Sequence, residues 1–187
     1  LDVDLGTLDY RLIQEDGLTY VSLRSLVSGT YDNMLARYAR EGAKARGSKA
    51  VIYDLRGNVG GSDSWPRKWI QSFLGTQNSI ETSMLYAQKN SALFAAENSE
   101  SLLPEDEGTC FAREVHGTWY ENDIPIIVLV DDHCGSSGEG AVQLLKTLDN
   151  VLIVGSNTAG YQLCGNISTF TLPYTGIGVR FGSTLFL

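Results

Sequence analysis

The sequence predicts an α/β layer fold, in which short buried strands alternate with helices. Short, almost wholly apolar runs are separated by segments whose apolar residues recur at helical spacing, which is typical of strands covered by helices. The chain, residues 1–187, is 43% hydrophobic and 19% charged, which is enough for one domain with a proper core. Alternating segments near both ends of the chain predict antiparallel hairpins at the ends of this layer.

The first third of the chain contains a hairpin, a helix and a strand that runs into a turn. Residues 10–23 form two short alternating runs around Asp16-Gly17, a dipeptide that favours a tight hairpin turn. Residues 33–45 repeat apolar side chains at helical spacing. The apolar run at 49–56 predicts a buried strand, which breaks into a glycine-rich turn at 57–61.

The middle of the chain is less regular. A helix is expected over residues 64–74, and a further strand over 80–87. The segment 97–108 is acidic and rich in turn residues, which predicts an exposed excursion. The run Pro125-Ile-Ile-Val-Leu-Val then gives the strongest strand signal in the chain.

Three further elements are predicted toward the C-terminus. Residues 139–148 carry apolar side chains on one helical face, and 151–155 form a short apolar strand. Residues 169–187 alternate like a terminal hairpin around Tyr174-Thr-Gly.

The composition argues against several classes of partner. The 14 basic and 22 acidic residues give a net charge of −8, whereas nucleic acids and anionic membranes require clustered lysine and arginine. No apolar run approaches the roughly 20 residues of a membrane helix, and residues 1–6 carry two aspartates and no basic stretch typical of a signal peptide. We therefore expect no nucleic-acid partner and no transmembrane segment, while an oligomer remains open.

The cysteines and histidines do not form a recognisable metal site. Cys110, Cys134 and Cys164 are far apart and odd in number, which argues against zinc ribbons and redox pairs; free thiols are favoured over one disulfide. His116 and His133 have no carboxylate at the spacing of zinc ligands. No metal and no cofactor are expected.

The first candidate motif is Asp54-Leu-Arg-Gly-Asn-Val-Gly-Gly, where the predicted strand at 49–56 ends. Glycines in such a turn expose backbone N–H groups that can bind an anion or an oxyanion. The motif fits neither a P-loop nor a dinucleotide fingerprint. The structural alternative is a strand-to-helix turn in which Asp54 and Arg56 form an ion pair.

The second candidate motif, at residues 131–140, places serines where a buried strand ends and a helix begins. There the N–H groups of the helix can stabilise an oxyanion, which suits a nucleophile. The spacing is not that of the Gly-x-Ser-x-Gly elbow. The alternative is helix capping, with Ser136 or Ser137 as N-cap and Glu139 in the first turn.

A serine nucleophile needs a general base, and the chain offers two histidines for this role. His133 lies three residues before Ser136, but closeness in sequence does not establish that the side chains meet. For His133 and His116 alike, the alternative is a solvated loop histidine.

Three blocks of the sequence resemble the C-terminal-processing serine peptidases, the family of tail-specific proteases, the tricorn core and the retinoid-binding repeats of the eye. The run at 50–61 is similar to the family's strand followed by Asp-Leu-Arg-x-Asn-x-Gly-Gly. Residues 125–139 resemble its nucleophile block, and 151–160 its Val-Gly-x-x-Thr-x-Gly block, followed by a similar strand at 170–173. The blocks occur in the family's order, and the likeness spans about residues 10–187.

The resemblance implies a site as well as a fold. It implies a crotonase-like core of stacked β-α units. By the same likeness Ser136 is the nucleophile, and the oxyanion hole combines the N–H of Ser137 with that of Gly60 or Gly61. Glu139 is interpreted as a first-turn helix residue.

The sequence also departs from the family pattern. Tail-specific members carry a catalytic lysine directly after the Thr-x-Gly block, where this chain has Tyr161, and Lys146 has no claim to the role. The sequence therefore resembles the tricorn-type branch more closely, in which a histidine upstream of the core and a glutamate downstream of the nucleophile complete the catalytic machinery. Neither has a convincing counterpart here, and no PDZ-like segment precedes the core.

Three functions follow as expectations. The first is a peptidase core, expected to be part of a longer protein, that cleaves peptides or unfolded proteins at or near their C-termini; its base is then His133 or a residue of an upstream segment. The second is a degenerate member that binds peptide or an apolar ligand without hydrolysis, and the third is an esterase for small acyl substrates. The family suggests an extracytoplasmic location, either periplasmic, at the cell surface or secreted.

Overall fold

A computed structural model describes residues 10–29, 31–92, 95 and 103–186 of the chain. The chain divides into two compact units. The first unit consists of Leu1–Thr82 and Gly117–Gly160, and the second of Ser83–His116 and Tyr161–Leu187. Among the described residues, no helix combines the length and the apolar character needed to cross a membrane.

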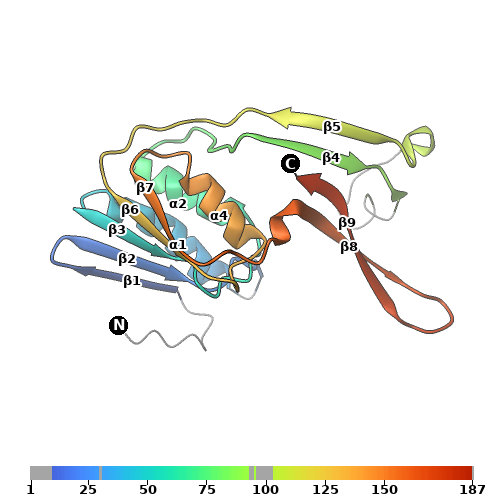
Figure 1. Ribbon diagram of the computed structural model, residues 1–187, viewed down its shortest axis with the longest axis horizontal. Coiled ribbons are helices and arrows are strands. Elements are labelled where there is room, and N and C mark those ends of the chain that lie inside the picture. The colour runs from blue at the N-terminus through green and yellow to red at the C-terminus, as the bar shows by residue number, and fades with distance from the viewer. Residues whose placement is uncertain (1–9, 30, 93–94, 96–102, 187) are drawn as a thin grey trace. The chain divides into compact units, whose positions relative to one another are not determined.

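The first unit contains a five-stranded sheet in the order β1-β2-β3-β6-β7 (Figure 1). Strands β1 and β2 pair antiparallel, and the remaining neighbours pair parallel. The elements in chain order are β1 (Tyr10–Glu15), β2 (Leu18–Leu23), α1 (Asp32–Ala45), β3 (Ala50–Asp54), α2 (Ser64–Leu74), β6 (Ile126–Val130), α4 (Ser137–Leu145) and β7 (Val151–Gly155).

The predicted elements of this unit are confirmed. The hairpin turns at Asp16 and Gly17, whose φ angles of 53° and 83° match the left-handed turn that such a dipeptide favours. Helix α2 has the bounds expected from the sequence, and α1 begins one residue earlier than expected. Helix α4 begins two residues earlier, at Ser137, and ends at Leu145 rather than Leu148.

One face of the sheet and the three helices share a single core. The strands contribute alternate residues, among them Val51 and Tyr53 of β3 and Val128 of β6, of which Tyr53 and Val128 are paired in register. The helices contribute apolar side chains that lie at helical spacing, such as Trp69 and Leu144. In Figure 1 these helices lie beside the sheet, which matches the predicted layering of helices on parallel strands.

Helices α1 and α2 pack unusually close to each other. A Cβ atom on Gly42 of α1 would lie 2.3 Å from the carbonyl oxygen of Trp69 in α2, so no larger residue fits at this crossing. Ser72 reinforces it, because its hydroxyl donates to the Arg40 carbonyl and accepts from the Ala43 N–H. The two helices therefore form a fixed pair on the surface of the first unit.

The second unit is a four-stranded antiparallel sheet in the order β5-β4-β9-β8. Its strands and its two short 3₁₀ helices are β4 (Met84–Lys89), η1 (Pro104–Asp106), β5 (Cys110–Val115), η2 (Tyr161–Leu163), β8 (Cys164–Thr171) and β9 (Gly178–Phe186). Strands β8 and β9 confirm the predicted terminal hairpin, but this hairpin belongs to a second sheet rather than to the α/β layer. A mixed α/β fold is therefore confirmed, with a division into two sheets that the sequence did not indicate.

Two predictions in the second unit differ from the structure. The strand expected at 80–87 begins only at Met84, because Ile80 is fully buried in the core of the first unit. Strand β5 was not predicted; it lies at an edge of the sheet, and its sequence mixes charged and apolar residues without clean alternation. Of the expected excursion at 97–108, residues 97–102 lie outside the described residues, and the exposed turn around η1 agrees with it.

Candidate active site

Three loops of the first unit meet where the parallel strands β3, β6 and β7 end. Loops after the carboxyl ends of neighbouring parallel strands lie at the same edge of a sheet, where α/β proteins place their binding sites. The glycine-rich turn at 57–61, the serine-bearing turn at 131–136 and the loop at 156–160 are joined by hydrogen bonds. The bonds that connect them are Gly135 N to Asn58 O at 2.9 Å, Ala159 N to Cys134 O at 2.8 Å and Gly57 N to Asp131 Oδ1 at 2.8 Å.

Ser136 has a strained backbone. Its φ of 52° and ψ of −124° lie in a region that residues other than glycine rarely adopt. The predicted capping role is confirmed, since Ser136 is the N-cap of α4 and forms a capping box with Glu139. N-cap residues normally have an extended backbone, however, so capping alone does not account for the positive φ. Strain of this kind is concentrated at functional sites.

The glycine-rich turn passes directly against this serine. A Cβ atom on Gly60 would lie 2.6 Å from the Cβ of Ser136, and Gly60 itself has a φ of 98°. Gly61 has a φ of 143°, and a Cβ there would lie 2.0 Å from the Leu26 carbonyl carbon. The two motifs that sequence reasoning treated separately are therefore in contact, and both glycines are required by space as well as by φ.

The backbone N–H groups around Ser136 differ in what they bind. The Gly60 N–H donates to Asn58 Oδ1 at 2.9 Å. Within the described part of the chain, the N–H groups of Gly61 and Ser137 have no hydrogen-bond acceptor. The Ser137 hydroxyl donates to the Gly61 carbonyl oxygen at 2.9 Å, which holds these two residues beside each other.

Glu139 connects the serine turn to the loop after β7. Its buried carboxylate accepts from the Ser136 N–H at 3.0 Å through Oε2, and through Oε1 from the Thr158 hydroxyl and the Gly160 N–H, both at 2.7 Å. The interpretation of Glu139 as a first-turn helix residue is confirmed. Its link to the Thr-Ala-Gly loop was not predicted, although the capping-box spacing of Ser136 and Glu139 was a visible signal.

Two further residues that organise the turns were missed by sequence reasoning. Asn58 is fully buried, and its Nδ2 donates to the Leu23 carbonyl at 2.8 Å. Asp131 Oδ1 accepts from three backbone N–H groups, those of Gly57, His133 and Cys134. Both residues lie inside predicted turns, where asparagine and aspartate typically bind nearby backbone, and this was the available signal.

The predicted pairing of Asp54 with Arg56 is confirmed and is part of a larger cluster. Arg56 NH2 lies 2.8 Å from Asp54 Oδ2, the Tyr20 hydroxyl donates to the same oxygen at 2.7 Å, and Arg24 lies 3.3 Å from Oδ1. Burial raises the pKa of Asp54, but the hydrogen bonds from Arg56, Tyr20 and Arg24 outweigh it and hold this pKa well below its usual range. The Asp54 carboxylate is thus a fixed anion that anchors the start of the glycine-rich turn.

The His133 ring binds a neighbouring carboxylate rather than Ser136. The His133 ring is 76% exposed, and its Nδ1 lies 2.8 Å from Asp132 Oδ1; no hydrogen bond joins it to Ser136 within the described residues. His116 belongs to the second unit, is exposed, and lies 3.9 Å from Glu114. A catalytic role for His133 stays a prediction that needs its side chain to reorient.

Tyr161, which occupies the position of the family's catalytic lysine, and Lys146, the nearest lysine in the helix, are both exposed. Tyr161, which follows the Thr-Ala-Gly loop, is 68% exposed in the second unit. Lys146 follows the last residue of α4, whereas Ser136 precedes the first. The length of the helix, about 14 Å at 1.5 Å per residue, therefore separates the two backbones.

One group of possible metal ligands was not expected from the sequence. The side chains of Asp131, Asp132 and His133 bring their ligand atoms within 4.8 Å of one another. One oxygen of Asp131 is already engaged by backbone N–H groups, and the cluster carries no further sign of an ion. The cysteines are free thiols, with Cys134 buried in the site and the other two, Cys110 and Cys164, exposed.

Comparison with known proteins identifies a family. The model of the family described as Peptidase family S41 matches residues 17–182. No curated protein is detectably similar in sequence.

Three solved structures have a similar fold. A candidate peptidase from Parabacteroides merdae is 24% identical, with a TM-score of 0.55 over 98% of this chain and 55% of its own. A lipoprotein from Streptococcus agalactiae is 18% identical, with a TM-score of 0.53 over 95% of this chain and 58% of its own. The photosystem II D1 C-terminal processing protease is 17% identical, with a TM-score of 0.51 over 90% of this chain and 37% of its own. The chain therefore spans about half the length of these proteins, or less.

Proposed function

The chain belongs to peptidase family S41, and from this membership and the geometry around Ser136 we propose that it is the core of a serine peptidase that cleaves polypeptides at or near their C-termini. The observation that carries the proposal is the strained backbone of Ser136, at the start of α4 and in contact with Gly60. The fold proposed for this core is crotonase-like, and the chain as a whole is proposed to act as one peptidase core.

In the proposed reaction Ser136 is the nucleophile. Its Oγ attacks the carbonyl carbon of the scissile peptide bond and loses its proton to a general base. The tetrahedral intermediate then collapses, the C–N bond breaks, and the amine leaves with a proton. Water hydrolyses the resulting acyl-serine. The N-terminus of α4 points its positive dipole end at this position, which favours the negative charge of the intermediate.

The proposed oxyanion hole combines the N–H groups of Ser137 and Gly61. Sequence reasoning left Gly60 and Gly61 open. The Gly60 N–H is engaged by Asn58, whereas the Gly61 N–H has no acceptor within the described residues, so Gly61 is the better donor. The bond from the Ser137 hydroxyl to the Gly61 carbonyl would keep the two donors in register before substrate binds, which is the condition for strong stabilisation of an oxyanion.

The general base is proposed to come from outside the described residues. The His133 ring binds Asp132 and would have to leave this partner to reach Ser136. The related structures are longer than this chain, and a histidine in an upstream segment, as in the tricorn-type branch, is the base that we propose. His133 is the second candidate.

The substrate and the location are proposed by analogy with the similar structures. One of them is a C-terminal processing protease, which supports a peptide or unfolded protein with an accessible C-terminus as the substrate. Another is a lipoprotein, which supports an extracytoplasmic location. The net charge of −8 supports neither nucleic acid nor an anionic membrane as a partner.

Labelling with a fluorophosphonate probe tests the nucleophile. We expect the wild-type protein, studied with its full natural sequence, to be labelled and Ser136→Ala to remain unlabelled, whereas Ser79→Ala, which removes an exposed serine outside the three loops of the site, should label like wild type. Equal labelling of wild type and Ser136→Ala would contradict the proposal.

Labelling, combined with assays of peptide binding and of ester turnover, separates the two other functions. An absence of labelling together with saturable peptide binding would show a binding module without catalysis. Turnover of small activated esters far above that of any peptide would show an esterase. The observation that favours the binding module is that the His133 ring, among the described residues of the first unit, binds Asp132 and not the Ser136 hydroxyl.

A further inference from the structure

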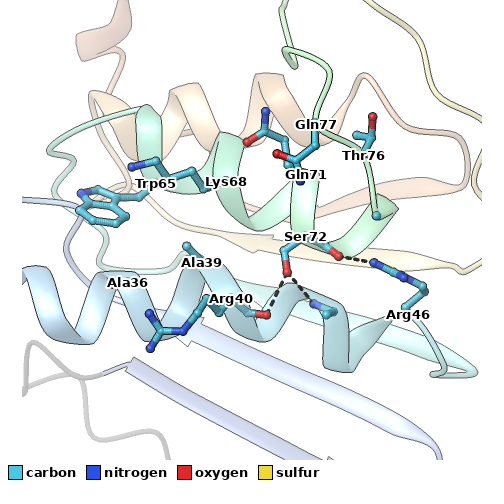
Figure 2. A pocket seen from close by; sticks show the side chains of 12 residues that line it. Ala36, Ala39, Arg40, Arg46, Trp65, Lys68, Gln71, Ser72, Thr76 and Gln77 are labelled. Carbon is cyan, nitrogen blue, oxygen red and sulfur yellow. Dashed lines mark hydrogen bonds between the residues drawn. The ribbon is translucent and has the colours of Figure 1, made fainter.

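A groove with basic walls runs between helices α1 and α2 on the first unit (Figure 2). Its volume is about 600 Å³, and residues from both helices and from the segment after α2 line it. None of its lining residues belongs to the candidate active site. Figure 2 shows Arg40 and Trp65 toward one end and Arg46 toward the other.

The groove is cationic in a chain that is acidic overall. Its twelve lining residues include Arg40, Arg46 and Lys68, and no aspartate or glutamate. The whole chain, in contrast, carries 14 basic and 22 acidic residues. Such a local excess of positive charge on a negative protein attracts an acidic partner to this place and repels it elsewhere.

The charged groups are available to a ligand to different degrees. The Arg40 guanidinium is exposed and has no hydrogen bond or ion pair within the described residues. The Lys68 ammonium lies 4.5 Å from the centre of the Trp65 ring and has no carboxylate partner there. Arg46 is the least available, because its Nε donates to the Phe73 carbonyl at 2.9 Å and its Nη2 to the Ser72 carbonyl at 2.6 Å.

The floor of the groove allows a peptide backbone to approach closely. It contains the small side chains of Ala36, Ala39 and Ala43, and Gly75 lies at the end of α2. The polar side chains of Gln71 and Gln77 can donate and accept hydrogen bonds along the walls. Because Gly42 fixes the two helices against each other, the groove exists before a ligand arrives.

We propose that this groove binds an extended, acidic segment of a partner protein. Arg40 and Arg46 are six residues apart, which corresponds to about 9 Å along a helix. An extended chain advances about 3.3 Å per residue, so a segment of a few residues is long enough to pass both arginines, which line the same groove. Lys68 lies on the opposite wall and adds a third contact. The proposal is independent of the function proposed for Ser136.

The charge pattern favours a peptide over other anions. Arg40 and Lys68 lie on opposite walls, and Arg46 is bound at the end of α2, so a ligand with several spaced charges uses more of the groove than a single phosphate does. A membrane surface or a nucleic acid would require a broad face of unpaired basic groups. The other basic side chains of these two helices are paired, Arg37 and Lys44 with Glu41 and Arg67 with Glu81.

Fluorescence anisotropy with a synthetic peptide tests the proposal. The probe is a fluorescein-labelled peptide with glutamate at every third position and alanine and serine between, and the control probe carries glutamine in place of glutamate. We expect the glutamate peptide to bind, the glutamine peptide to bind far more weakly, and the affinity to fall as salt is added.

Two double variants with equal net charge locate the binding site. Arg40→Glu/Lys68→Glu should lower the affinity for the glutamate peptide about tenfold or more, because two attractive pairs become repulsive. Arg113→Glu/Arg180→Glu, at exposed positions of the second unit, changes the net charge by the same amount and should leave the affinity unchanged. Far-UV circular dichroism confirms that each variant is folded.

Three results would overturn the proposal. The first is an equal loss of affinity in both double variants, which would assign the binding to net charge. The second is the absence of peptide binding together with binding to vesicles of phosphatidylglycerol that depends on Arg40 and Lys68. The third is concentration-dependent self-association that Arg40→Glu/Lys68→Glu abolishes, which would make a second copy of this chain the occupant.

Discussion

Replacing Glu139 by glutamine should destabilise the first unit by an amount that the hydrogen bonds of its carboxylate allow us to estimate. The carboxylate accepts from Ser136, Thr158 and Gly160 at 2.7–3.0 Å and is buried. A glutamine keeps one oxygen for Thr158 and Gly160 and turns an NH₂ group toward the Ser136 N–H. One hydrogen bond to a charged acceptor, worth about 1.5–3 kcal/mol, is lost, and the other two become weaker because the acceptor is neutral. We expect a loss of about 3 kcal/mol.

Urea unfolding followed by tryptophan fluorescence measures this loss in the relevant unit. All three tryptophans, Trp65, Trp69 and Trp119, belong to the first unit, so their signal reports its unfolding. Glu121→Gln is the matched control, because Glu121 is an exposed residue of the same unit, and a change within about 0.5 kcal/mol is expected there. If Glu139→Gln also stays within about 0.5 kcal/mol of wild type, the buried carboxylate does not hold the two loops together, and our account of the site is refuted.

Three further predictions concern neighbouring residues. Asp54→Asn should lower the free energy of unfolding by about 3–5 kcal/mol at pH 7, since it leaves the buried Arg24 without a full charge partner. Because the folded-state pKa of Asp54 is depressed, the stability that its carboxylate contributes is fully present above its unfolded pKa of about 4 and is lost as the pH falls below that value. Urea unfolding measured at a series of pH values should therefore show less loss of stability on acidification in the variant than in wild type. Gly61→Ala, which forces a Cβ against the Leu26 carbonyl, should reduce fluorophosphonate labelling about 10²-fold, whereas Gly47→Ala, where nothing lies within 4 Å, should not; equal labelling of the two would argue against the proposed oxyanion donor. Burial, with the nearby carboxylates, raises the pKa of Cys134 to about 12, so native protein treated with iodoacetamide at neutral pH should gain only two adducts by mass spectrometry, and a third would contradict the buried thiol.

The elements of the first unit could be predicted because each one carries its own local signal. The Asp16-Gly17 turn, the helical spacing in α1 and α2, and the apolar runs of β3, β6 and β7 are all visible within a few residues. The second sheet could not be predicted in the same way. Strand β4 pairs with β9, about a hundred residues later in the chain, and no local pattern indicates so distant a partner.

The site was predicted in its parts but not in its connections. Ser136 and the two glycines were identified from a resemblance to a family, and spacing alone left each motif undecided between a structural and a catalytic role. The structure adds contacts that depend on the third dimension: the Gly60 turn packs on Ser136, and Glu139 reaches Thr158 across nineteen residues of sequence. These contacts connect three loops that are far apart in the chain, so no single window of sequence contains them.

Capping and nucleophilic function need not be alternatives for Ser136. An N-cap with ordinary extended backbone would end the strand-to-helix turn at no conformational cost, yet this serine adopts a φ of 52°. Glu139 binds the Ser136 N–H and thereby stabilises that conformation, while the Ser137 N–H stays without an acceptor in the described structure. The capping box therefore supplies the interaction that offsets the strain, and the strained turn brings the serine, the helix N-terminus and the glycine turn to one point. For this reason the stability lost in Glu139→Gln and the reactivity of Ser136 should change together.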